Sequence, residues 1–157
     1  MVTLRAVGAD DWRVWRELRL QALAEAPHAF GTKLHEWLDQ GDTEARWRNR
    51  LCGVPLNIIA NVDRKRAGMV SATAPDSNQA VELISMWVAP FARGRGVGDA
   101  LVKAVIQWSK DQNARYVTAD VKEDNLPAIV LYARHGFAFS DDRAANEPGE
   151  RTMVREI

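Results

Sequence analysis

The stretch Glu82-Leu-Ile-Ser-Met-Trp-Val-Ala-Pro-Phe-Ala-Arg-Gly-Arg-Gly-Val-Gly98 decides the fold. It is typical of an apolar strand, then a turn of glycines and arginines, then a helix that starts at Asp99. Glycines at 94, 96 and 98 carry no side chain, so the backbone there can approach another group closely. A helix start points free N–H groups and the positive end of its dipole at the same place. These features predict a phosphate or diphosphate site at the end of a strand.

Two common phosphate-binding motifs do not fit this turn. A P-loop requires Lys-Ser/Thr after its last glycine, and no such pair follows Gly98. A dinucleotide fingerprint requires Gly-x-Gly-x-x-Gly, but Asp99 and Leu101 stand where its third glycine would be. The remaining pattern is Arg93-x-x-Gly96-x-Gly98. On this segment alone, a solvated turn remains the alternative.

A second motif lies downstream. Residues 116–121 are rich in β-branched and aromatic side chains and predict a strand. The string Asn125-Leu-Pro-Ala-Ile-Val-Leu-Tyr-Ala-Arg-His-Gly-Phe137 follows, with Asn125 at a good N-cap position and Pro127 in the first turn. Gly136 ends the short helix that this string predicts.

The two motifs together resemble those of the GCN5-related N-acetyltransferases, or GNAT family. The first resembles the family's coenzyme A diphosphate loop, and the second its Asn-x-x-Ala-x-x-Leu-Tyr-x-x-x-Gly-Phe segment. The resemblance implies transfer of an acetyl group from acetyl-CoA, as co-substrate, to a primary amine, without a metal. It also implies that coenzyme A is bound by residues of the central strand, the turn and the second motif: Met86, Trp87, Val88, Arg93, Gly94, Arg95, Gly96, Val97, Gly98, Asp99 and Asn125.

The resemblance also implies which residues carry the chemistry. The central strand would separate from its neighbour near residues 86–88, and the N–H of Val88 would polarise the thioester carbonyl. Tyr132 is the candidate general acid, because a phenol is protonated at neutral pH and can protonate a leaving thiolate. Glu82 is the candidate base, acting through a water, with a solvated carboxylate at a strand start as the alternative. Asp99 is a departure, since an acidic side chain facing inward would repel a diphosphate.

The order of predicted elements gives the fold class. It predicts an α/β fold of the mixed α+β kind, a mostly antiparallel sheet flanked by helices. The expected helices are 10–24, 32–38, 43–51, 98–110 and 128–135; the expected strands are 3–7, 56–62, 67–73, 81–88, 116–121, 137–139 and 152–157. We expect a single N-acetyltransferase domain over 1–157, with an acceptor side (1–53), an acetyl-CoA-binding core (54–140) and a C-terminal loop and strand (141–157).

Composition bounds the function. The 157 residues carry 21 basic and 21 acidic side chains, so the net charge gives no support for nucleic-acid binding. Cys52, the one cysteine, is expected to be a buried small residue, and its isolation favours a reducing, cytoplasmic location. No apolar run is long enough for a membrane span, and no signal-type segment opens the sequence. The family resemblance also implies a homodimer, formed through residues 137–157.

The acceptor amine is expected to bind between the helices of residues 10–50 and the turn after Val62. Trp37 is the candidate for lining that pocket, and Glu36, Asp39 and Glu147 could attract a cation there. Small-molecule and peptide amines both remain open as acceptors. Two other functions remain open as well: transfer of a different acyl group, and a non-catalytic acyl-CoA sensor or interaction module.

Overall fold

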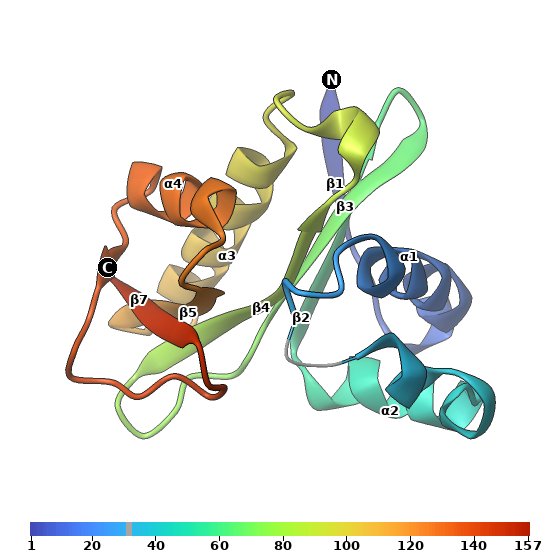
Figure 1. Ribbon diagram of the computed structural model, residues 1–157, viewed down its shortest axis with the longest axis horizontal. Coiled ribbons are helices and arrows are strands. Elements are labelled where there is room, and N and C mark those ends of the chain that lie inside the picture. The colour runs from blue at the N-terminus through green and yellow to red at the C-terminus, as the bar shows by residue number, and fades with distance from the viewer. Residues whose placement is uncertain (31–32) are drawn as a thin grey trace.

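The computed structural model describes residues 1–30 and 33–157 and confirms the predicted mixed sheet (Figure 1). The strand order is β1-β2-β3-β4-β5-β7-β6, and every neighbouring pair is antiparallel except the parallel pair β4 and β5. The strands are β1 (Val2–Ala6), β2 (Leu56–Val62), β3 (Lys65–Ala72), β4 (Ala80–Val88), β5 (Tyr116–Lys122), β6 (Ala138–Phe139) and β7 (Glu150–Glu156). The α-helices are α1 (Trp12–Glu25), α2 (Glu44–Gly53), α3 (Val97–Asp111) and α4 (Leu126–Arg134).

Helices cover both faces of the sheet, with α3 and α4 on one face and α1 and α2 on the other (Figure 1). Successive side chains of a strand point to opposite faces. In β2, Ile58 and Ala60 therefore belong to the core under α3, whereas Ile59 belongs to the core under α1 and α2. The central strands are apolar on both faces for this reason.

A polar network joins α1 to α2. Arg16 of α1 donates through Nε to Asp42 at 2.7 Å, and the indole N–H of Trp47 in α2 donates to the same carboxylate at 2.8 Å. The Arg16 hydrogen bonds and then the Trp47 hydrogen bond lower the pKa of Asp42 to about 2. Asp42 is thus held as an anion that ties the two helices together.

Two local expectations differ from the structure. The helix expected over 32–38 is a short 3₁₀ turn, Leu34–Trp37, and residues 31–32 lie outside the described residues. Cys52 is exposed rather than buried, because it lies on the outer face of α2 next to the buried Leu51. In the described part of the chain, every helix is too short or too polar to cross a bilayer.

Candidate active site

The sheet opens between β4 and β5. The two strands pair only over Ala80–Glu82 and Tyr116–Thr118, although β4 continues to Val88 alongside β3. The pairing register of β3 with β4 shifts between Met69 and Ser71, opposite Ser85, whose φ is 55°. Such a bulge bends a strand and strengthens its twist, so β4 turns away from β5. The opening starts after Glu82 and includes the predicted residues 86–88.

Backbone groups of β4 face this opening. Ala89 donates its N–H to the carbonyl of Ala67 in the neighbouring segment. Along an antiparallel strand, successive residues direct their N–H groups to opposite edges. The N–H of Val88 therefore points away from β3, toward the side from which β5 has separated. This edge is available for a ligand that pairs with it as an added strand.

The glycine turn joins β4 to α3. Gly94 and Gly96 have φ values of 76° and 84°, which side chains rarely tolerate, and Gly96 caps the N-terminus of α3. Gly98 serves packing instead, because a Cβ there would lie 3.0 Å from the Leu131 side chain of α4. The N–H groups at the start of α3 thus lie beside two glycines, which have no side chains to cover them.

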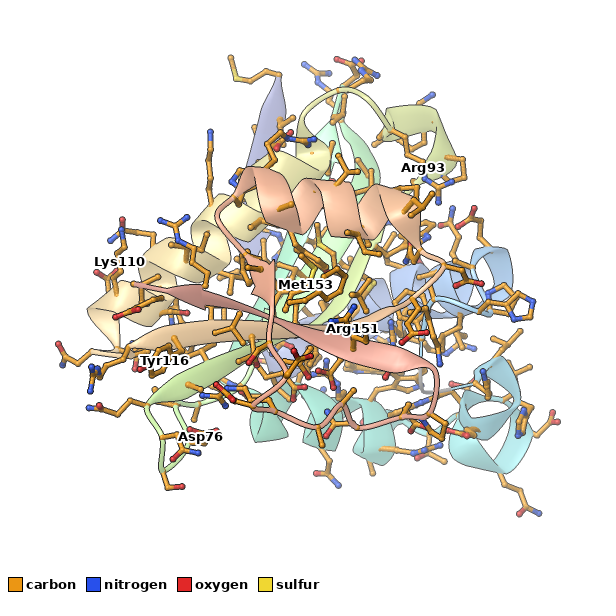
Figure 2. All side chains as sticks on the ribbon, turned by 60° about the vertical axis from the view of Figure 1, so that its left-hand side comes forward. Asp76, Arg93, Lys110, Tyr116, Arg151 and Met153 are labelled. Atoms are coloured by element: carbon orange, nitrogen blue, oxygen red, sulfur yellow. The ribbon has the colours of Figure 1, made fainter. Side chains whose placement is uncertain are left out.

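A cavity of about 550 Å³ lies against this turn and α4. It is lined by most of the residues that the sequence predicts for coenzyme A: Met86, Trp87, Val88, Arg93, Gly94, Gly96, Val97, Gly98, Asp99 and Asn125. Arg93 is fixed there, donating through Nε to the Val88 carbonyl at 3.1 Å and through Nη2 to Glu25 at 2.9 Å. This end of the opening is far from the place where β4 and β5 still pair, as the positions of Arg93 and of Tyr116, the first residue of β5, show in Figure 2.

Arg95 is the predicted residue that does not line this cavity. Its guanidinium instead pairs with Asp63 in the turn between β2 and β3, at 2.8 Å. The 63–64 turn is therefore beside the glycine turn, and it lies outside the cavity that holds Glu36 and Trp37. The turn after Val62, expected beside the acceptor, therefore does not line the cavity that contains the candidate residues Glu36 and Trp37.

Asp99 does line the cavity, but its charge is matched. Arg134 donates to its Oδ1 through Nε and Nη2 at 3.0 and 2.9 Å, and His135 Nε2 lies 2.6 Å from the same oxygen. The His135 and Arg134 hydrogen bonds lower the pKa of Asp99. Arg134 itself lines the cavity and was missed by the sequence reasoning, although a basic residue in the last turn of α4 was visible.

Tyr132 is buried in α4 and lines a second, narrower cavity of about 100 Å³. Its ring lies 5.5 Å from that of Phe137, and none of the described hydrogen bonds uses its hydroxyl. Burial raises the pKa of Tyr132, so the phenol remains protonated at neutral pH. The narrow cavity is also lined by Ser85, Asp120 and Asn125.

Glu82 lines a third cavity of about 460 Å³, on the α1 and α2 side. Its Oε2 accepts a hydrogen bond from Asn146 Nδ2 at 2.9 Å. Burial, followed by the nearby charge of Asp120, raises the pKa of Glu82. A carboxylate with a raised pKa is a better base than a solvated one.

Other side chains of the third cavity come from several separate segments of the chain. Glu36, Trp37 and Glu147 line it as expected, whereas Asp39 does not. The sequence reasoning missed several lining residues that have no motif around them: Trp15, Arg19, Trp47, Arg50, Asp120 and Glu150. The sequence pointed to a few acidic and aromatic residues one by one, but it gave no sign that they line one pocket.

The three cavities adjoin one another. Met86, Asn125 and Leu131 line both the large cavity at the glycine turn and the narrow one. Ser85 and Asp120 line both the narrow cavity and the one that holds Glu82. Tyr132 lies in the narrow middle space, where a molecule from each side would meet. Among the described residues, no group of three or more potential metal ligands is present.

Known proteins resemble this chain in sequence and in fold. The sequence model of the "Acetyltransferase (GNAT) family" matches residues 13–137. Streptothricin acetyltransferase of Streptomyces lavendulae is 30% identical over 82 residues, which is 52% of this chain and 43% of that protein. Mycothiol acetyltransferase of Nocardioides is 28% identical over 151 residues, 90% of this chain and 51% of that protein. The chain spans about half the length of the curated relatives it matches.

A solved structure shares the fold. The PaiA N-acetyltransferase of Thermoplasma acidophilum, in complex with coenzyme A, superposes with a TM-score of 0.78 at 13% identity. The match covers 100% of this chain and 99% of that one. At this identity the likeness shows the fold alone.

Proposed function

This chain belongs to the GNAT family of acetyltransferases, and on that premise we propose that it acetylates a primary amine. The acetyl group comes from acetyl-CoA and passes directly to the amine while both substrates are bound. The relatives named for streptothricin and mycothiol acetylation support an amine-bearing acceptor.

The observation that carries the proposal is the meeting of three cavities in the opening between β4 and β5. A thioester entering from the glycine turn and an acceptor entering from the α1 and α2 side would meet beside Tyr132. Holding both reactants in one geometry lowers the barrier because little orientational freedom remains to be lost.

The residues on the glycine-turn side fit coenzyme A. Free N–H groups at the start of α3 suit a diphosphate, and positive φ at Gly94 and Gly96 leaves the backbone uncovered. Arg134 places N–H donors at the same cavity, with its charge matched by Asp99. The free edge of β4 suits the amide groups of the pantetheine arm.

The chemistry forms one C–N bond and breaks one C–S bond. The amine nitrogen attacks the thioester carbonyl carbon, and the N–H of Val88 stabilises the negative charge on the oxygen. Glu82 accepts the amine proton through a water. Tyr132 gives its proton to the departing thiolate, which leaves as the free thiol of coenzyme A.

Turnover over an amine panel tests this proposal. Small drug-like amines, polyamines, amino acids and a lysine peptide are incubated with acetyl-CoA, and acetylated products are identified by mass spectrometry. We expect acetylation in at least one class, with release of one thiol per product. Coenzyme A binding without any product would favour the sensor function. Faster transfer from propionyl-CoA or succinyl-CoA would favour another acyl group.

We also propose a homodimer formed through residues 137–157 and a cytoplasmic location. The edge strand β6 and the exposed side chain of Phe139 support the first, and the unpaired Cys52 supports the second. Light scattering at micromolar concentration is expected to give the mass of two chains, and a monomeric mass would contradict the dimer.

A further inference from the structure

Two arginines, one buried and one partly buried, line the cavity that holds Glu82. Arg19 of α1 is only 8% exposed, and its Nη1 is buried without a hydrogen-bond partner among the described residues. Its guanidinium lies 4.5 Å from the centre of the Phe30 ring. In the described part of the chain, no carboxylate forms an ion pair with Arg19. Buried arginines normally have a partner, so this one is unusual.

Arg50 of α2 is the second cation. It donates to Asn57 Oδ1, Ser71 Oγ and Ser85 Oγ, each at 3.0 Å, and all three acceptors are neutral. These bonds fix its position without matching its charge. Burial lowers the pKa of Arg50 to about 10, and burial together with the Arg50 charge lowers that of Arg19 to about 9. Both side chains nevertheless remain cations at neutral pH.

A third donor lies in the same place. The indole Nε1 of Trp15 is buried without a partner among the described residues, and Trp15 lines the same cavity. The Arg50 guanidinium lies 5.4 Å from the centre of its ring. Unmatched charge and unsatisfied donors in a low-dielectric site cost free energy unless an acceptor fills the site.

The carboxylates of the cavity lie on other elements. Glu82 is on β4, Asp120 is on β5, and Glu147 and Glu150 belong to the segment that leads into β7. The arginines are on α1 and α2, and Arg50 reaches Ser85 of β4. The cavity therefore has both of its arginines on the helices and most of its carboxylates on β4, β5 and the segment before β7, with Glu36 of the Leu34–Trp37 turn as a further carboxylate beside α1.

We propose, on the premise of the proposed function, that the acceptor is a small amino-acid-like zwitterion whose carboxylate binds Arg19 and Arg50. Its amine then lies toward Glu82 and Asp120, where the acetyl group arrives. The planar guanidinium of Arg19 suits a carboxylate, which accepts two parallel hydrogen bonds. A volume of about 460 Å³ is ample for one amino acid.

Matched probes test this assignment. The standard L-amino acids and spermidine are first screened with acetyl-CoA. For each amino acid acetylated, and for L-phenylalanine, L-methionine and L-lysine in any case, the free acid is compared with its carboxamide and its decarboxylated amine. Charge-assisted hydrogen bonds contribute about 1.5–3 kcal/mol, so we expect kcat/KM for the acid to exceed both others by about 10- to 100-fold. Calorimetry with coenzyme A-saturated protein gives the same comparison without turnover.

The variant Arg19→Met removes the charge and keeps the length of the side chain. We expect it to lose the preference for the acid by raising KM for that probe alone, while Arg19→Lys retains part of it. Unchanged coenzyme A affinity and circular dichroism show that each variant is folded.

The outcomes separate this inference from the proposed function. Equal or better acetylation of the carboxamides, the decarboxylated amines or spermidine overturns the anion site and leaves the acetyltransferase standing. Binding of the acids without turnover retains the anion site and overturns the enzyme. Absence of binding by every amino acid overturns the inference outright.

Discussion

The two sides of the opening between β4 and β5 are built differently. On the α3 side the surface is largely backbone: the edge of β4, the glycine turn and the first N–H groups of α3. On the α1 and α2 side it is largely side chains, with tryptophans, carboxylates and arginines from separate segments. A backbone site requires a few glycines at fixed spacing, whereas a side-chain site can be built from many combinations. This difference explains why one side carries a motif and the other does not. Under the proposed function, the side-chain wall selects the acceptor.

The largest expected effect lies between the two sides, at Tyr132. Tyr132→Phe removes only the hydroxyl, so turnover should fall by about 10²-fold because the leaving thiolate loses its proton donor. Acetyl-CoA affinity should stay nearly constant. Steady-state rates and calorimetry measure both quantities.

The other tyrosine provides the control for that variant. Tyr116 begins β5, outside the three cavities, and Tyr116→Phe should keep normal turnover. If Tyr132→Phe also turned over normally with its best acceptor, the hydroxyl would be structural or product release would limit the rate.

On the backbone side, a substitution at Gly96 should disrupt coenzyme A binding most directly. Gly96→Leu strains a residue with φ of 84° and places a side chain in the cavity, so coenzyme A affinity should fall by well over tenfold. Gly149→Leu is the matched control, since Gly149 has φ of 81° with nothing within 4 Å of an added Cβ and lies outside that cavity. Equal calorimetric affinities of the two folded variants would remove the glycine turn from the site.

The base at Glu82 predicts a pH dependence. Its pKa is raised by burial and by Asp120, with smaller contributions from Glu150 and Asp76, so the carboxylate loses its proton at a higher pH than usual. The rate should therefore rise with pH through a midpoint above 4.5, the ordinary value for glutamate. Glu82→Gln should remove that rise and lower kcat about tenfold or more.

A control for the pH profile is Glu156→Gln, which changes an exposed glutamate at the end of β7. This variant should keep the rise of the rate with pH. If Glu82→Gln also kept that rise, another group would be the base, and Asp120, which lines the same cavity, is the candidate.

The smallest effects are expected on the side-chain wall. Glu36→Gln and Trp37→Phe should each raise the acceptor KM by several-fold, about 1 kcal/mol, and leave the KM of acetyl-CoA unchanged. Glu17→Gln, an exposed change on α1, is the control. Equal changes in both KM values would exclude the Leu34–Trp37 turn from the acceptor site.

The sequence predicted the backbone side of the opening better than the side-chain side. Strand alternation and the glycine turn predicted the sheet, and the family resemblance predicted its opening, because backbone geometry leaves a local pattern. Arg95 was grouped with Arg93 by position, yet it turns to Asp63, since neighbours on a turn point in different directions. Arg19 gave no signal at all, because burial of an arginine depends on how α1 packs against Phe30 and α2.

Two-substrate kinetics test the central claim most directly. In the proposed mechanism, acetyl-CoA and the amine occupy one opening together and the acetyl group passes straight between them. Initial rates measured over both concentrations should therefore give double-reciprocal lines that intersect. Parallel lines, with an acetylated protein detected by mass spectrometry when the amine is withheld, would contradict it.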